Sequence, residues 1–142
     1  MWLILNIIGF FDSIMMKKGA LKHYQQKLHQ YQEQEAETLI DIGVIFLEED
    51  QGEKALKHFQ DALKTYKKLE YPEGEAFTHD LIGDTYLTTR NITKALQHYQ
   101  DSFKIYASLK SPLKNEIFDK IKEAEKAEEV MEIVKNKKAK QN

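Results

Sequence analysis

Apolar residues recur at three- and four-residue steps along most of the chain, which is the spacing of one face of an α-helix. In residues 35–74 this face forms two runs on either side of the polar segment 48–52. The first run holds Leu39, Ile42, Phe46 and Leu47, and the second holds Ala55, Leu56, Phe59, Ala62, Leu63, Tyr66 and Leu69. The pattern predicts two helices joined by a short turn. A second turn is expected over 71–74, because Pro72 cannot continue a helix and Gly74 tolerates a left-handed backbone.

The same pattern returns in residues 75–114, so the chain contains an internal repeat. Equivalent residues lie 40 positions apart (83 − 43), as in the pairs Gly43 and Gly83, Ala55 and Ala95, His58 and His98, and Pro72 and Pro112. A fixed period of this length is typical of helical repeat architectures, in which neighbouring units bury a shared core. The small residues at 43 and 55 are expected where one helix must approach its partner closely.

The repeat resembles the tetratricopeptide repeat (TPR) family. The positions that carry the resemblance are Leu39, Ile42, Gly43, Phe46, Ala55, Phe59 and Ala62 in the first unit, and His79, Ile82, Gly83, Tyr86, Ala95, Tyr99 and Ser102 in the second. His79 and Ser102 depart from the family pattern. The length resembles the 40-residue variety of polarity adaptors of the LGN type and of kinesin light chain. The resemblance implies an all-α, right-handed superhelix of about three helix-turn-helix units plus a C-terminal capping helix, which binds proteins or peptides.

Residues 1–34 are predicted to be a degenerate first repeat. Residues 20–31 match the second helix of the later units, residues 2–16 take the place of the first helix, and Lys17-Lys18-Gly19 is expected to form a short turn. Segment 1–16 lacks the basic start and cleavage site of a secretory signal, and it is shorter than the roughly 20 apolar residues of a membrane span. A buried helix is favoured, and membrane association stays open.

A terminal repeat normally presents a polar outer face. This one would expose apolar side chains, which commonly mark an interface. We therefore expect this helix to form a homodimer or to dock on a partner through Trp2, Leu3, Leu5, Ile7, Phe10 and Phe11, and membrane contact stays the alternative.

The remaining boundaries follow from the same pattern, with residues 1–142 forming a single TPR domain. Full repeats are expected over 35–74 and 75–112, with Ser111 capping the helix that follows. Residues 113–135 keep one apolar face and are predicted to be the capping helix, and residues 136–142 a frayed basic tail.

Composition and motifs argue against nucleic-acid binding, catalysis and metal binding. The formal net charge is −2, which gives no general attraction to nucleic acid, and the chain has no Cys. Known catalytic motifs are lacking, so no enzyme, cofactor or metal site is expected. His23, His58 and His98 share one repeat position that the resemblance places on the outer surface, whereas His79 is expected to pack between helices. The missing Cys fits a cytoplasmic protein.

Function is expected on the inner wall that the resemblance assigns to the first helix of each unit. The positions concerned are Glu37, Ile40, Asp41, Val44, Leu47, Glu48, Phe77, Asp80, Leu81, Asp84, Leu87 and Thr88. An acidic groove with an apolar floor favours a basic and apolar partner segment, and replacing Asp80 and Asp84 with Lys should abolish binding while helicity is kept. The predicted function is therefore an adaptor that binds a peptide or helix. The alternative is a self-assembling or membrane-associated structural subunit that uses the N-terminal helix.

Overall fold

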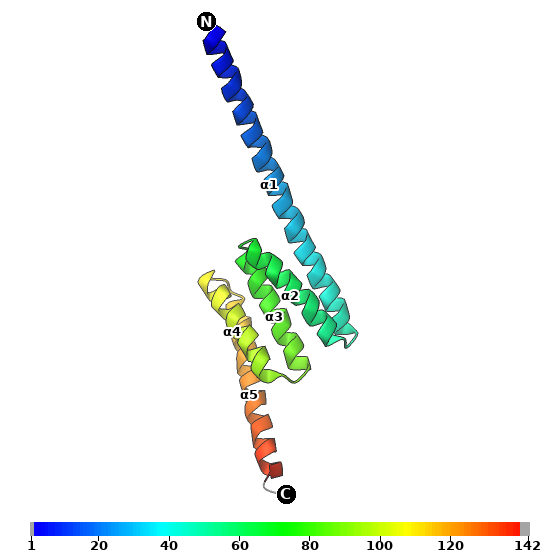
Figure 1. The fold of residues 1–142 in the computed structure, drawn as a ribbon. Helices are drawn as coiled ribbons and strands as arrows, with labels where there is room; N and C mark the ends of the chain where they lie inside the picture. Colours follow the sequence, from blue (N-terminus) through cyan, green and yellow to red (C-terminus); the bar gives the residue numbers. More distant parts are fainter. Residues whose placement is uncertain (1, 140–142) are drawn as a thin grey trace.

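The computed structural model describes residues 2–139, and within that range the chain forms five helices and no strand. They are α1 (Trp2–Glu48), α2 (Gly52–Lys68), α3 (Pro72–Thr88), α4 (Ile92–Ser108) and α5 (Lys114–Ala139). The end of α1 packs on α2, and α3 packs on α4, so each pair forms a hairpin (Figure 1). The second hairpin lies against the first, and α5 covers α4. The predicted all-α helical repeat fold is confirmed.

Close contacts between a glycine and an aromatic ring hold each hairpin together. A Cβ atom built on Gly43 would lie 2.5 Å from Cε1 of Phe59, and one on Gly83 would lie 2.6 Å from Cδ1 of Tyr99. Both rings are fully buried. The prediction that these glycines mark tight approaches between helices is confirmed, because any larger residue would collide with a ring that has no room to move.

The turns between helices share one backbone conformation. Asp50, Glu70, Arg90 and Lys110 all have a positive φ between 53° and 59°, and they follow one another at 20-residue intervals (70 − 50). A single left-handed residue is a common way to end a helix. The prediction for Gly74 is wrong, because Gly74 lies inside α3 and none of the described glycines has a positive φ. Pro72 begins α3 instead of ending α2, since the first helical position needs no backbone N–H.

The predicted first repeat does not form a hairpin. Helix α1 runs without a break through Lys17-Lys18-Gly19 and into the first helix of the unit that begins at residue 35. One glycine inside a helix costs only about 1 kcal/mol, and an existing helix extends by one hydrogen bond for each residue added, so Gly19 alone does not end α1. Residues 2–34 of α1, which we call the overhang, extend away from the two hairpins (Figure 1). None of the described helices is long and apolar enough to cross a membrane.

The C-terminal helix closes the array as predicted, with Ile117, Ile121 and Ala124 buried against α4. The backbone N–H of Leu113 donates a hydrogen bond to Oγ of Ser111 over 3.3 Å, just before α5 begins. Helix α5 is longer than expected and continues to Ala139. The prediction of a frayed tail is therefore wrong for residues 136–139, and residues 140–142 lie outside the described part.

Candidate functional site

A pocket of about 500 Å³ opens between the two repeat units. Its wall comes from α1, from the ends of α2 and α4, from the start of α3 and from the turn before α5. We call it the inter-unit pocket, and it is lined by Glu37, Ile40, Asp41, Tyr66, Tyr71, Glu73, Gly74, Phe77, Tyr106, Ser111 and Leu113. Many of these residues are equivalent positions of the two units, such as Glu37 with Phe77 and Tyr66 with Tyr106. The pocket is therefore a product of the stacking of one unit on the next.

Aromatic rings form most of the apolar wall of the inter-unit pocket. The ring centroids of Tyr66 and Tyr71 are 5.6 Å apart, and the two rings are tilted against each other by 44°. Tyr66 and Tyr106 are buried, whereas Phe77 remains 46% exposed at the mouth. Rigid aromatic walls of this kind bind apolar or cationic side chains well, because little side-chain entropy is lost on contact.

The electrostatic potential in the inter-unit pocket is negative. Three lining residues, Glu37, Asp41 and Glu73, carry carboxylates, and none of the lining residues is basic. Burial, and after it the negative charge of Glu37, raises the pKa of Tyr66 to about 12. The pKa values of Tyr71 and Tyr106 are also raised, first by burial and then by nearby carboxylates. The phenols therefore stay protonated and can donate hydrogen bonds.

The structure brings together only some of the predicted groove residues. Glu37, Ile40, Asp41 and Phe77 line the inter-unit pocket. Partly buried positions within the helix packing hold Val44, Leu47, Leu81 and Leu87. At the opposite end of the hairpins, Leu47 and Thr88 border a small hollow of about 160 Å³, and Glu48 is exposed at the end of α1.

Asp80 and Asp84 face the capping helix instead of open solvent. Nζ of Lys120 lies 2.7 Å from Oδ1 of Asp80 and 3.0 Å from Oδ2 of Asp84. The hydroxyl of Tyr99 donates to Oδ1 of Asp84 over 2.6 Å. Both carboxylates therefore hold α5 in place. The sequence-based test that replaced them with Lys would set three ammonium groups together and loosen α5, so it would not isolate partner binding.

Seven lining residues were not among the predicted site residues: Tyr66, Tyr71, Glu73, Gly74, Tyr106, Ser111 and Leu113. The correspondence of Tyr66 with Tyr106 was visible in the repeat, but an aromatic residue at helical spacing is read first as core. In the structure, the last turns of α2 and α4 lie beside the first helix of the neighbouring unit, and this places Tyr66 and Tyr106 in the wall of the pocket. A repeat alignment alone does not contain that relation between units.

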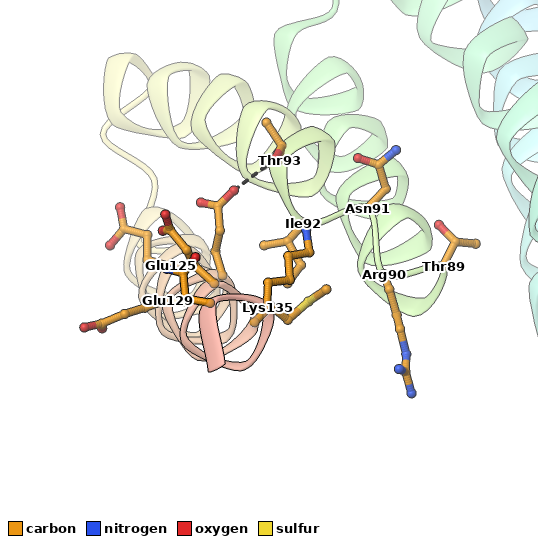
Figure 2. Close-up of a pocket in the computed structure, with 12 residues that line it drawn as sticks. Thr89, Arg90, Asn91, Ile92, Thr93, Glu125, Glu129 and Lys135 are labelled. Atoms are coloured by element: carbon orange, nitrogen blue, oxygen red, sulfur yellow. Dashed lines mark hydrogen bonds between the residues drawn. The ribbon is translucent and has the colours of Figure 1, made fainter. Parts of the chain in front are cut away.

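A second, larger hollow of about 800 Å³ lies between the α3–α4 turn and the end of α5 (Figure 2). The hydroxyl of Thr93 donates to Oε1 of Glu128 over 2.9 Å. Few apolar side chains contribute to its wall, and it offers weaker anchoring than the inter-unit pocket.

Two of the histidines form an internal pair. Nδ1 of His79 lies 2.9 Å from Nδ1 of His98, so one ring donates the hydrogen bond and the other accepts it. His79 packs between helices as predicted, but His58 and His98 are partly buried, which contradicts their expected place on the outer surface. His58 stacks on Phe46 with ring centroids 5.3 Å apart. The histidine three residues after Ala55 or Ala95 thus packs against the first helix of its own hairpin.

The predicted self-association residues fall in the overhang. The side chains of Trp2, Leu3, Leu5 and Ile7 lie outside the described part of the structure. Phe10 and Phe11 are 67% and 62% exposed. The predicted exposure of apolar side chains at this end therefore holds for the two residues that are described.

Comparison with known proteins gives one family match. The family described as tetratricopeptide repeat matches residues 34–108, which cover both hairpins from the last residue of the overhang to the end of α4. None of the curated proteins compared with the chain matches it.

Proposed function

Because the chain belongs to the tetratricopeptide repeat family, whose repeats mediate protein–protein interaction, we propose that it is an adaptor that holds a segment of a partner protein in the inter-unit pocket. The single observation that carries this proposal is the lining of that pocket, which combines exposed carboxylates with aromatic rings. The pocket lies among Glu37, Asp41 and Phe77, which the family resemblance places on the inner wall.

The chemistry of the pocket favours a basic and apolar partner segment. A Lys or Arg side chain can place its charge near Glu37 and Asp41 while its stem lies on the rings of Tyr71 and Phe77. A neighbouring Leu or Ile would fill the apolar part of the pocket. The charges would mainly raise the rate of association and select the partner, and the buried apolar contacts would supply most of the affinity.

Two finer expectations belong to the same proposal. The recurrence of turns at residues 50, 70, 90 and 110 supports the 40-residue variety of the family, because each helix with its turn takes 20 residues. An adaptor of this kind, without Cys, is proposed to work in the cytoplasm.

Binding of synthetic peptides to the full chain tests the proposal. Fluorescence anisotropy would compare labelled peptides in which Arg or Lys flanks Leu or Ile with peptides of the same composition in which Glu replaces the basic residues. We expect the basic set to bind and the acidic set not to bind. The variant Glu37→Gln with Asp41→Asn should weaken binding by about tenfold, and Phe77→Ala by a similar factor, since each removes an exposed contact of about 1.4 kcal/mol.

A matched control places the same change of charge elsewhere. Glu129→Gln with Glu132→Gln neutralises two carboxylates beside the larger hollow and should leave peptide affinity unchanged. Equal loss of affinity in this control, or no loss in the pocket variants, would place the binding surface outside the inter-unit pocket.

A second candidate function is a self-assembling or membrane-associated subunit that uses the overhang. One observation favours it: apolar side chains on that part of α1, among them Phe10, Met16 and Tyr24, are about two-thirds exposed or more. This surface is separate from the inter-unit pocket, so the two candidates do not exclude each other.

A further inference from the structure

Between residues 15 and 31, the overhang is a helix that no other described part of the chain covers. Helix α1 contacts α2 through its C-terminal part, and the described side chains from residue 15 to residue 31 are all exposed. An isolated helix in water is only marginally stable, and most helices in proteins are stabilised when an apolar face packs against something. The overhang therefore lacks the packing that a helix of this length needs.

Six of its apolar residues follow a seven-residue pattern, whereas the exposed Phe11, Met15 and Met16 lie off it. Steps of four and three residues alternate along the positions Phe10, Ile14, Lys17, Leu21, Tyr24, Leu28 and Tyr31. We call these seven positions the seam; six of them are apolar, and Ile14 alone is partly covered. An average spacing of 3.5 residues, kept over about three heptads, is the pattern of two helices that wind around each other.

The seam does not continue the face that packs on α2. That face carries Ala36, Ile40 and Gly43. At about 100° per residue, the seam is rotated from it by roughly a quarter of a turn around the helix. A further hairpin packed on the continuation of that face would leave the seam uncovered. The partner of the seam must therefore approach α1 from a different side.

We propose that the seam binds the seam of a second copy of this chain, with the two helices antiparallel. The seam positions alternate between two sets, one with residues 10, 17, 24 and 31 and the other with residues 14, 21 and 28. In an antiparallel pair, a position of one set faces a position of the other set. Phe10 then lies opposite Leu28, Ile14 opposite Tyr24, and Lys17 opposite Leu21. Each of these layers joins a large or charged side chain to an aliphatic one. A parallel pair would instead stack Lys17 on Lys17 and each tyrosine on itself, which brings two ammonium groups together inside the contact.

The length of the overhang fits this arrangement. The pairing is symmetric about residue 19, so position 2 of one copy lies opposite position 36 of the other, where the hairpin begins. The seam from residue 10 to residue 31 spans about 33 Å at 1.5 Å per residue. Each copy then uses the whole overhang, and the two hairpin regions lie at opposite ends with their inter-unit pockets free.

Light scattering after size-exclusion chromatography of the full chain tests the pairing. We expect twice the chain mass of 16.7 kDa for the wild type. The seam variant Leu21→Glu with Leu28→Glu should elute at the mass of one chain, whereas Gln26→Glu with Gln30→Glu, which adds the same charges on the far side of the helix, should keep the dimer. A wild-type protein that stays a monomer at high micromolar concentration, or a seam variant that stays a dimer, overturns the proposal.

The direction of the helices can be read from cross-links, because the chain has no Cys of its own. A mixture of the single variants Lys17→Cys and Leu21→Cys, oxidised with oxidised glutathione, should give the mixed disulfide as the main product by mass spectrometry. Predominant Leu21→Cys homodimer would show parallel helices and overturn the antiparallel arrangement.

Membrane contact is the competing use of the seam. Co-sedimentation with vesicles of zwitterionic or anionic phospholipid should recover no wild-type protein. A wild-type monomer that binds such vesicles, and loses that binding in the seam variant, overturns the proposal in favour of a lipid surface. The peptide affinity of the inter-unit pocket should not change in the seam variant, so failure of one proposal leaves the other intact.

Discussion

Gly74 lies directly against the ring of Tyr66: a Cβ atom added at Gly74 would stand 2.5 Å from Cδ1 of that ring. Tyr66 is buried, and Gly74 lies inside α3 with an ordinary helical backbone. The glycine is therefore required for close approach and not for a turn. This contact joins the second helix of one unit to the first helix of the next, and it forms part of the wall of the inter-unit pocket.

Gly74→Ala should destabilise the protein by about 2 kcal/mol, because the added methyl group forces the buried Tyr66 ring out of its place. Chemical denaturation would measure the change in the free energy of unfolding. Gly19→Ala is the matched control, since nothing lies within 4 Å of the added Cβ atom there. That change should stabilise the helix by about 0.5–1 kcal/mol, and a stabilising Gly74→Ala would contradict the contact.

Lys120→Met should loosen the capping helix. It removes the cation between Asp80 and Asp84 while it keeps the apolar stem, and Asp80 is then left partly buried without a partner. We expect a loss of about 2 kcal/mol in the free energy of unfolding, which is less than for a fully buried pair because water reaches Lys120.

A double-mutant cycle distinguishes this network from a general loss of charge. Lys120→Met combined with Asp80→Asn should cost less than the sum of the two single changes. Lys104→Met, which breaks an exposed ion pair with Asp101, should cost less than about 0.5 kcal/mol. Additive effects in the cycle would mean that Lys120 and Asp80 do not act together.

The histidine pair should make the protein less stable in mild acid. Burial, and after it the neighbouring His98, lowers the pKa of His79 from 6.5 to about 4. Burial also lowers the pKa of His98. A group whose pKa is lower in the folded state binds fewer protons there than in the unfolded chain, so its contribution to stability is complete above pH 6.5 and declines as the pH falls towards 4.

The contribution of this pair should amount to about 2 kcal/mol over that range. Urea denaturation of the wild type and of His79→Leu at pH 7 and pH 4.5 would measure it. The variant should lose less stability between the two pH values, because carboxylates titrate equally in both proteins. The same pH dependence in wild type and variant would rule out the pair as its source.

Glu70→Gly should stabilise the protein by about 1 kcal/mol, because a left-handed backbone strains every residue with a Cβ atom. Glu70 has a φ of 53° between α2 and α3. We expect thermal unfolding to shift upwards by about 3 °C. Glu73→Gly, three residues on and inside α3, should instead lower stability by about 1 kcal/mol, and equal effects of the two changes would contradict the role of the turn.

The repeat core could be predicted from the sequence because its contacts recur. Gly43 with Phe59 and Gly83 with Tyr99 are the same contact made twice, so a 40-residue comparison reveals it. The ion pair of Lys120 with Asp80 joins two equivalent positions of successive units, which a repeat comparison places in register but does not place in contact. Whether Asp80 is free to contact a partner protein or is bound to α5 depends on Lys120, a residue that occurs only once in the repeat pattern.

The N-terminal hairpin was predicted wrongly for a related reason. Residues 20–31 resemble the second helix of the later units, and this resemblance is real at the level of composition. A hairpin, however, is made by its turn. The observed turns contain Gly, Pro or Asn close to the left-handed residue, whereas Gly19 stands alone with helix-forming residues on both sides. The local preference for a continuous helix therefore prevailed.

The turns at residues 50, 70, 90 and 110 give the protein a fixed unit of length. A tandem duplication of 40 residues, wherever it began, would insert one whole hairpin and keep every later turn in phase, so such an array can grow by copying its own gene segment. The 20-residue spacing of the turns ends near residue 30 and near residue 130, where α1 and α5 continue through the positions at which a turn would be expected. At these two places the chain ceases to fold back on itself and reaches outward.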